Sequence, residues 1–273
     1  HDVIVSRVQA TARAEVGLVT SRGRLVKVSV LDLPTVPSTA NAPNLQGGAS
    51  VVELVTLESD ERVLCLSTLA ADSLGLALGT AQGVVKRVNP EIIGKDSWDL
   101  IRLEDGDAVV GAAELVSTDV ELVFVTTDAQ LLHFSAEAVR PQGRAGGGIA
   151  GIKLSSGARV TYFGAVPRGD TVLVTNSGTS SALPGTDAGL VKVTQFGEYP
   201  AKGRATAGVR CHKFLKGEDT LLLAWAGPVP AVAAAASGSP IELPDPDRRR
   251  DGSGVSLGQP LAAVSSRAVS TGS

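Results

Sequence analysis

An internal repeat constrains this chain more than any other feature. Each copy has an apolar strand, a turn, a second strand ending in Thr-x-x-Gly or a related pattern, and a return strand that often carries Lys or Arg. The copies are Asp2 to Val28, Glu61 to Val88, Asp107 to Phe134, Ala158 to Val193 and the eroded Asp219 to Leu243. Alternating apolar residues bounded by Gly, Ser, Asp and Pro, without sustained helical periodicity, predict an all-β fold.

The turn positions give the period of the repeat. We expect turns at Gly23, Gly83, Gln130, Gly178 and Gly238, which are 60, 47, 48 and 60 residues apart. Two insertions explain the longer intervals: the loop Pro34 to Gly48, and the hairpin tip Thr179 to Ala188, after which Thr186-Asp-Ala-Gly189 repeats the turn signature. A period of this length is typical of propeller blades, each built from four strands.

A glycine-rich connector follows each of several hairpins. The clearest copies begin at Pro141 and Pro200, and weaker ones lie at Leu45 to Val51 and Arg249 to Val255. We therefore predict a single domain over residues 1–264, a propeller-like ring of about five four-stranded blades. The expected blades are 1–60, 61–106, 107–157, 158–218 and 219–264, and the Ser-rich residues 265–273 are expected to form a disordered tail.

The net charge of −3 conceals a strong asymmetry along the chain. Residues 53–128 carry a net charge of −10, whereas residues 137–216 carry +7. Duplex DNA is held mainly by cations that displace its counterions, so the basic stretch is the expected footprint of a nucleic acid. The acidic stretch is expected to face elsewhere.

Candidate DNA contacts are polar side chains on the connectors and hairpins. Glycines beside them allow a phosphate to approach the backbone amides. The connector candidates are Arg140, Gln142, Arg144, Lys153, Lys202, Arg204, Arg210, Lys213 and Lys216, and the hairpin candidates are Arg22, Arg24, Lys27, Lys86, Arg87 and Lys192. For Arg22, Arg24 and Lys86, a simple need for soluble hairpin tips explains the charge equally well. Arg248, Arg249 and Arg250 stand among Asp245, Asp247 and Asp251, which are expected to neutralise them.

The blades and connectors resemble a known family. Gln142-Gly-Arg-Ala-Gly-Gly-Gly148 occupies the place of a Gln-Arg-Arg-Gly-Gly-Lys-Gly box, and Glu198 to Trp225 is also similar. The chain thereby resembles the C-terminal domain of the A subunit of bacterial type IIA topoisomerases, most closely topoisomerase IV of the actinobacterial type and secondly gyrase. The resemblance implies a β-pinwheel whose blades exchange strands and whose rim binds and bends duplex DNA. It also implies a cytoplasmic, nucleoid-associated protein that works with the rest of the A subunit and an ATPase B subunit.

The box departs from its gyrase form, because Gly143 and Gly147 stand in place of two cations. By resemblance, degenerate boxes belong to topoisomerase IV-type subunits, which bind bent DNA without wrapping it tightly. A wrapping domain of gyrase is the alternative. A second alternative is a protein-interaction propeller whose acidic second and third blades dock a partner, and which would not bind duplex DNA in a salt-sensitive way.

No catalytic site is expected in this chain. The family cleaves DNA with a tyrosine that follows an arginine, whereas Tyr162 and Tyr199 follow Thr161 and Glu198. The chain thus resembles a non-catalytic part of an ATP-dependent enzyme, and the lack of any Met indicates a piece of a longer protein.

Other activities receive little support. Two cysteines and three histidines, spread along the chain, predict neither a metal site nor a cofactor. An enzyme with its site in the ring channel would need convergent carboxylates; Asp60, Glu61, Asp105 and Asp107 recur at blade starts, but turns use such residues routinely. The most apolar run, Leu221 to Ala236, is broken by prolines and too short for a bilayer, so no membrane partner is expected.

Overall fold

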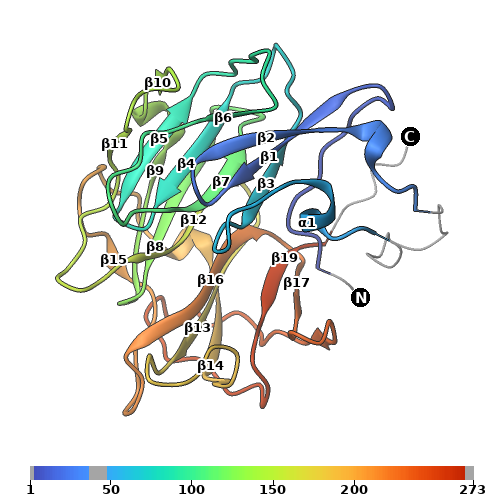
Figure 1. Cartoon of the computed structure of the whole chain (residues 1–273). Coiled ribbons are helices and arrows are strands. Elements are labelled where there is room, and N and C mark those ends of the chain that lie inside the picture. The colour runs from blue at the N-terminus through green and yellow to red at the C-terminus, as the bar shows by residue number, and fades with distance from the viewer. Residues whose placement is uncertain (1–2, 37–47, 268–273) are drawn as a thin grey trace.

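The computed structural model describes residues 3–36 and 48–267. Short strands make five sheets around a ring, labelled A to E in chain order, which confirms the predicted all-β, propeller-like architecture. Sheets A and B lie in the upper half of Figure 1, sheets D and E in the lower half, and sheet C between them on the left. Within the described residues the helical elements are short: α1 (Val51–Leu54), η1 (Val30–Asp32), η2 (Ala136–Ala138) and η3 (Phe196–Glu198).

The first three sheets each have at least four strands. Sheet A has the order β3 (Val63–Ser67), β1 (Glu15–Thr20), β2 (Arg24–Ser29), β6 (Ser97–Asp99). Sheet B has the order β7 (Val109–Glu114), β4 (Leu76–Thr80), β5 (Val84–Val88), β10 (Pro141–Gln142), and β11 (Ile149–Ala150) also pairs with β5. Sheet C has the order β12 (Val160–Pro167), β8 (Val120–Thr126), β9 (Gln130–Ser135), β15 (Val209–Arg210).

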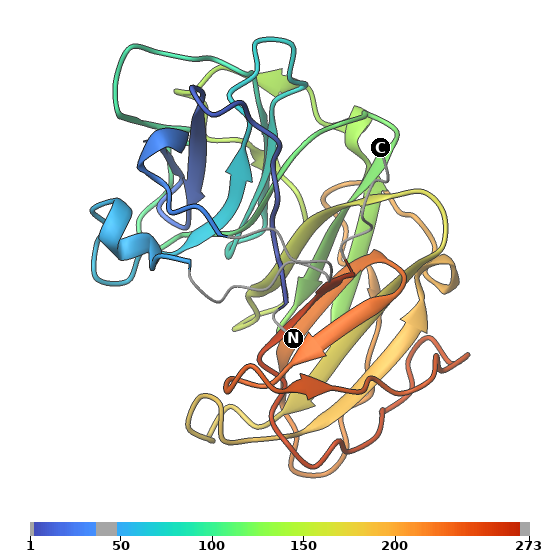
Figure 2. The ribbon, with the colours of Figure 1, turned by 90° about the vertical axis from the view of Figure 1, so that its right-hand side faces the viewer.

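The last two sheets are three-stranded, fewer than the predicted four. Sheet D has the order β16 (Thr220–Pro228), β13 (Thr171–Gly178), β14 (Leu190–Gln195), and an isolated bridge joins Val191 to Val255 at its outer edge. Sheet E has the order β19 (Ala263–Ser266), β17 (Ala231–Ala234), β18 (Pro240–Ile241). From the side, sheets C, D and E follow one another below and to the right of sheets A and B (Figure 2).

Neighbouring repeats exchange strands, as expected of a β-pinwheel. The hairpin β1–β2 of the first repeat pairs with β3 and β6, both from the second repeat. In the same way β4–β5 pairs with β7, β10 and β11 of the third repeat, and β8–β9 pairs with β12 and β15 of the fourth. Sheets A to D therefore each combine strands of two repeats, and in sheets A to C the outer strand belongs to the connector that follows the next hairpin. Sheet E differs, because all three of its strands follow the fourth repeat.

The hairpin turns explain the Thr-x-x-Gly signature. Backbone N–H groups of Gly23 and Gly83 donate to the carbonyls of Thr20 and Thr80 over 2.9 and 3.0 Å, with φ of +72° and +87° at the two glycines. Such positive φ values favour glycine because it has no Cβ. Gly238 has φ +82° and lies in the fifth turn as predicted.

Two of the predicted turn positions were wrong. In the third hairpin the turn residue is Ala129, with φ +60° and an N–H bonded to the carbonyl of Thr126, while Gln130 already begins β9. In the fourth hairpin Gly178 ends β13, and Gly189, with φ +57°, has the turn conformation after the insertion.

The core lies between adjacent sheets. Phe163 on β12 packs against Phe124 with ring centroids 4.8 Å apart, and it also covers two glycines of sheet B. A Cβ on Gly79 or Gly111 would lie 2.1 Å from an atom of Phe163, so neither strand tolerates a side chain there. Burying a side chain of this size contributes roughly 2–3 kcal/mol, and it fixes sheet C against sheet B.

The N-terminal segment joins the two ends of the ring. The Ser265 hydroxyl on β19 donates to the carbonyl of Ile4 over 2.6 Å, and the N–H of Leu66 on β3 donates to the Ser6 hydroxyl over 3.0 Å. Sheets E and A are thus tied through residues 4–6. The expected tail begins too early, since Ser265 and Ser266 belong to β19, and its residues 268–273 lie outside the described part of the chain. Residues 45–47 of the weak connector at 45–51 also lie outside it.

Candidate nucleic-acid interface

Three of the connectors cross the outer strand of the preceding hairpin at a glycine. Gly148, Gly208 and Gly254 have φ of +81°, +77° and +76°. A Cβ at these positions would lie 2.7, 2.1 and 2.7 Å from the carbonyl oxygens of Val85, Leu131 and Val191. Close packing on the sheet, rather than access for a phosphate, therefore requires these three glycines. Gly203 differs, because nothing lies within 4 Å of the position its Cβ would take.

An arginine stands four residues before each of these glycines: Arg144, Arg204 and Arg250, which we call the connector arginines. Arg144 is half-buried and its Nε lies 3.0 Å from Oε2 of Glu91, while Nη1 of Arg204 donates to the carbonyl of Ala150 over 2.6 Å. Arg250 is exposed, and within the described chain its guanidinium has no recorded partner. Arg250 was left out of the predicted contacts because the adjacent aspartates were expected to neutralise it. In the structure Asp247 pairs with Arg249 and Asp251 pairs with Arg210.

A second set of cations links successive connectors. Arg102, Lys153 and Lys213 are exposed, and we call them the bridge cations. The backbone N–H of each donates to a carbonyl of the next connector: Arg102 to Gly146 over 3.2 Å, Lys153 to Thr206 over 3.0 Å and Lys213 to Gly252 over 3.0 Å. These backbone hydrogen bonds join four successive connectors along the rim, and each bonded residue places an equivalent positive side chain there.

Arg102 was not among the predicted contacts, because the connector of the second repeat was missed. It contains β6, which pairs with β2 in the way that β11 pairs with β5. It lacks the glycines that drew attention to the later copies. The signal that identifies it is Ile101-Arg-Leu103, which matches Ile152-Lys-Leu154.

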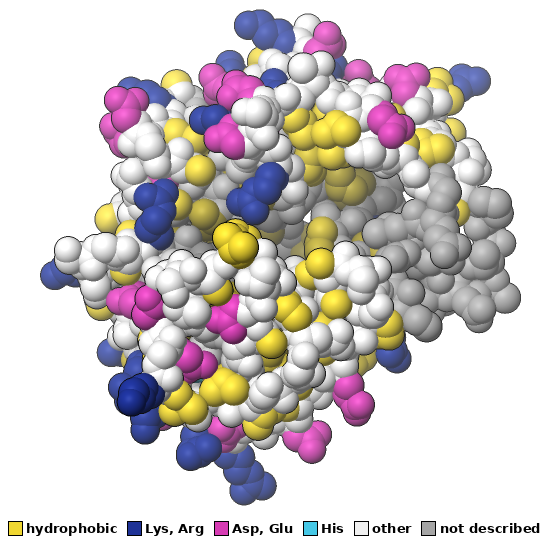
Figure 3. All heavy atoms as spheres, turned by 60° about the horizontal axis from the view of Figure 1, so that its bottom comes forward, with side chains coloured by type: hydrophobic (Ala, Val, Ile, Leu, Met, Phe, Trp, Pro, Cys, Tyr) yellow, Lys and Arg dark blue, Asp and Glu magenta, His cyan; other side chains and the backbone are white. Residues whose placement is uncertain are grey.

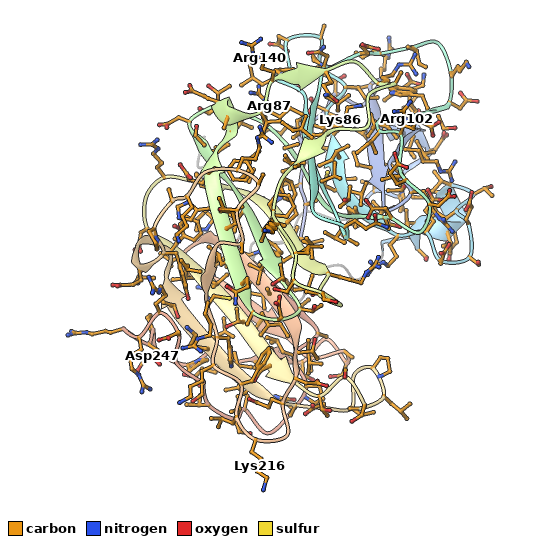
Figure 4. The ribbon with its side chains drawn as sticks, turned by 90° about the vertical axis from the view of Figure 1, so that its left-hand side faces the viewer. Lys86, Arg87, Arg102, Arg140, Lys216 and Asp247 are labelled. Atoms are coloured by element: carbon orange, nitrogen blue, oxygen red, sulfur yellow. The ribbon has the colours of Figure 1, made fainter. Side chains whose placement is uncertain are left out.

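The remaining connector candidates differ in their surroundings. Arg140, Lys202 and Lys216 are exposed, and Figure 4, which looks onto the rim, shows Arg140 and Lys216 pointing outward at opposite ends of the molecule. Arg210 is exposed but its Nη2 lies 2.8 Å from the Asp251 carboxylate. The Gln142 side chain accepts a hydrogen bond from the N–H of Gly148 over 3.1 Å, which gives it a structural role in folding the connector.

Three hairpin candidates are buried, which corrects their assignment to a surface track. Lys86 and Lys192 are each 1% exposed and Arg87 is 7% exposed. Nη1 of Arg87 donates to the carbonyls of Ala136 and Val139, both over 3.2 Å. In Figure 4 the labels of Lys86, Arg87 and Arg140 all lie in the upper half of the molecule, with Lys86 and Arg87 below Arg140, which stands at the top. Cations at these strand positions hold the connectors instead of facing a phosphate.

The cations of the first hairpin are all paired with carboxylates. Arg22 pairs with Glu58 and Asp60, and the Lys27 ammonium lies 2.9 Å from Glu15. Nε of Arg24 donates to the buried Glu61 over 2.6 Å.

The buried carboxylates at the blade starts hold the local fold together. The hydrogen bond from Arg24 is the main reason that the pKa of Glu61 falls to about 2. Asp107 accepts from the backbone N–H of Gln82 over 3.0 Å. These two carboxylates of the blade starts therefore fix turns of neighbouring hairpins, and among the described residues no group of three His, Cys, Asp or Glu is arranged to hold a metal.

The surface charge is uneven but mixed. On the face at the bottom of Figure 1, Lys and Arg side chains gather along the left and lower margins, with acidic side chains between them (Figure 3). The same face is hollowed between the two halves of the ring. Within the described residues, no helix is long and apolar enough to cross a membrane.

Comparison with known proteins identifies the family. The family described as "DNA gyrase C-terminal domain, beta-propeller" matches residues 121–167 and 185–222. Gyrase subunits A of Mycobacterium bovis and Escherichia coli are each 32% identical over 197 residues, which cover 70% and 69% of this chain. This chain spans about a fifth of those curated relatives, 22% and 20% of their lengths.

Solved structures share the fold. A C-terminal domain of DNA topoisomerase IV superposes with a TM-score of 0.75 at 18% identity, covering 93% of this chain and 79% of that one. A gyrase A C-terminal domain superposes with a TM-score of 0.65 at 18% identity, covering 93% and 83%. The chain belongs to the family of C-terminal domains of type IIA topoisomerase A subunits.

Proposed function

We propose that this member of the family binds duplex DNA along the rim that the connector arginines and bridge cations form. The observation that carries the proposal is the repetition of equivalent, outward-facing cations on successive connectors that are hydrogen-bonded to one another. Phosphate contacts need positive charge without base recognition, and a curved row of charges favours DNA that bends to follow it. Arg140 and Lys216 extend the rim toward its two ends.

The binding we propose is of the topoisomerase IV type, in which the domain bends DNA and positions it for strand passage without tight wrapping. Two features support this choice. Gly143 and Gly147 stand where the gyrase box has cations, and Arg144 and Arg210 are each paired with a carboxylate of a neighbouring connector. Each such carboxylate competes with a phosphate for its arginine, so the net charge offered to DNA is smaller than the count of cations.

Within a whole topoisomerase, we propose only a DNA-holding role for this domain. It would act within an A subunit, beside an ATPase B subunit, in the cytoplasm where the nucleoid lies. The strand-breaking chemistry and ATP hydrolysis would belong to those other parts, since this domain serves to hold DNA.

Salt-dependent binding of the 273-residue chain to a duplex of about 40 base pairs tests the proposal. The double variant Arg144→Ala, Arg204→Ala should bind more weakly and reduce the slope of log affinity against log salt by about two. Arg168→Ala is the matched control, because Arg168 is an exposed arginine paired with Asp119 away from the connectors. Failure of the parent to bind refutes the function, and unchanged binding by the double variant refutes this footprint.

The topoisomerase IV preference needs a separate measurement. The chain is bound to a nicked circular plasmid, the nick is ligated, and the change in linking number is measured. Weak wrapping predicts a change close to zero. A sizeable positive wrap would refute the preference and favour the gyrase alternative.

A further inference from the structure

Two buried lysines lie beneath the rim at equivalent positions. Lys86 on β5 and Lys192 on β14 each stand three residues after a turn glycine of positive φ, Gly83 and Gly189. Each side chain is 1% exposed, and within the described chain neither ammonium forms a salt bridge. A buried charge without a counter-ion is costly unless dipoles surround it, so the groups around each ammonium matter.

Main-chain carbonyls of the connectors surround both ammonium groups. Nζ of Lys86 donates to the carbonyls of Leu100, Arg144 and Gly146 over 2.7, 3.0 and 2.7 Å. Nζ of Lys192 donates to the carbonyls of Arg249 and Arg250 and to the Tyr199 hydroxyl. Burial lowers the pKa of both lysines to about 8, so both remain mostly charged at neutral pH.

Carbonyls that turn inward force the following amides to turn outward. In a trans peptide the C=O and N–H of one plane point to opposite sides. Because the carbonyls of Arg144 and Gly146 point at Lys86, the N–H groups of Ala145 and Gly147 point away from it. Neither N–H donates to another group among the described residues, and Ala145 is exposed. Two free amide donors above a buried positive charge form an arrangement that suits an anion.

Neighbouring side chains complete the arrangement in the third connector, which begins at Pro141. The hollow here is lined by Gln142 to Gly146 together with Glu91 and Asp99. The Arg102 guanidinium lies 3.9 Å from the position that a Cβ on Gly147 would take, and Arg144, which also lines the hollow, is paired with Glu91. Glu91 has to release Arg144 before an anion approaches.

We propose that Lys86 is a positioning residue that turns the amides of Ala145 and Gly147 outward to receive one phosphate of the DNA backbone, with Arg102 and Arg144 beside it. This inference rests on the proposed function and assigns a single phosphate site within the rim. Lys86 itself never contacts DNA; it acts through the connector and through the charge it places under it.

The fifth connector, Arg249 to Val255, offers a comparison within the same chain. Lys192 binds the Arg249 and Arg250 carbonyls in the same manner, but carboxylates accompany this connector: Asp247 accepts from the N–H of Arg249 over 2.8 Å, and Asp251 pairs with Arg210. Asp251 holds the place that Ala145 has in the third connector, so here a carboxylate stands on the connector itself and repels a phosphate, whereas Glu91 and Asp99 beside the third connector belong to the preceding one. Lys192 is therefore a matched comparison, a buried lysine of the same kind beneath a connector that offers the Arg250 side chain to the rim but is not expected to hold a phosphate on its amides.

The test compares Lys86→Met and Lys192→Met with the parent chain, using a duplex of about 40 base pairs as the probe. Both variants remove a buried ammonium, so both change stability, and circular dichroism with thermal unfolding establishes that they fold. We expect about tenfold weaker binding for Lys86→Met and binding close to that of the parent for Lys192→Met. Equal binding by folded Lys86→Met and the parent, or an equal loss in both variants, overturns the inference.

Amide NMR of the parent chain gives a second readout that does not depend on a variant. The proposal predicts that the amide proton signals of Ala145 and Gly147 move downfield on adding the duplex, and that they move further than those of Arg250 and Asp251, where DNA contacts only a side chain. A parent that binds DNA with the signals of Ala145 and Gly147 unmoved refutes this site and leaves the proposed function standing. A parent that does not bind the duplex refutes both.

Discussion

The crossing of the fourth connector over sheet C makes a quantitative prediction for stability. Gly208 has φ +77°, and a Cβ there would lie 2.1 Å from the carbonyl oxygen of Leu131. Gly157 has the same φ of +77°, with nothing within 4 Å of its Cβ position. Substituting Ala at either site adds about 1–2 kcal/mol of backbone strain. Only at Gly208 must the connector also move away from the sheet.

That movement disrupts the pairing between β15 and β9. The pairs Val209 with Leu131 and Arg210 with Gln130 weaken, as does the 2.9 Å hydrogen bond from the N–H of Cys211 to the carbonyl of Ala129. Losing two or three such bonds costs about 2–3 kcal/mol in the free energy of unfolding. Gly208→Ala should therefore be less stable than Gly157→Ala by about that amount.

Urea and thermal unfolding of the two variants measure this difference directly. For a domain of this size, the predicted gap corresponds to a melting temperature lower by about 5–10 °C in Gly208→Ala than in Gly157→Ala. The backbone strain cancels in the comparison, so the gap reports the carbonyl contact alone. Equal destabilisation of the two variants would show that the close approach has no energetic role, and the argument for the connector glycines would fail.

Two further predictions concern carboxylates. Arg24 holds the pKa of the buried Glu61 at about 2, below the usual 4.5 of a glutamate, so the contribution of this ion pair to stability is complete above about pH 4.5 and is lost as the pH falls toward 2. Glu61→Gln should remove up to about 3 kcal/mol of unfolding free energy at pH 7 and should flatten the acid side of a plot of urea midpoint against pH, and an unchanged acid side would contradict this. Glu91→Gln frees Arg144 and should raise the affinity for duplex DNA about two- to fivefold at low salt. Asp119→Asn, which frees Arg168, is the control. No gain, or an equal gain in the control, would exclude Arg144 as a residue for which Glu91 and a phosphate compete.

Repetition made the architecture predictable from the residues themselves, whereas strand exchange was expected only from the resemblance to the family, and the individual strand partners were not predicted. Repeated hairpins and turn signatures indicate a ring of blades without any knowledge of distant contacts. Strand partners such as β6 on β2 depend on pairing between segments about 70 residues apart, as between Val26 and Ser97, and a two-residue or three-residue strand has no periodicity of its own. Glycines revealed the third and fourth connectors, and their scarcity concealed the second.

The candidate site was predictable in its cations but not in their exposure. Arg144 and Lys86 both belong to recurring positive positions, yet one lies half-buried at the surface and the other is enclosed by carbonyls. Lys86 follows Val85 and precedes Arg87, and all three side chains are buried, because the connector covers the outer edge of β5. Alternating burial along a strand is expected only where one face of the sheet is exposed to solvent, and here the connector of the next repeat buries the residues of β5 on both faces.

The exchange of strands also has a mechanical consequence. A connector pulled by bound DNA is not a loop that swings freely, since it is hydrogen-bonded to the outer strand of the preceding sheet and to the neighbouring connector. Tension applied at Lys153 is transmitted through β11 to β5 of sheet B and through Thr206 to the fourth connector. The rim therefore behaves as an interlinked belt, in which force on one blade is shared by its neighbours and no blade can peel away alone.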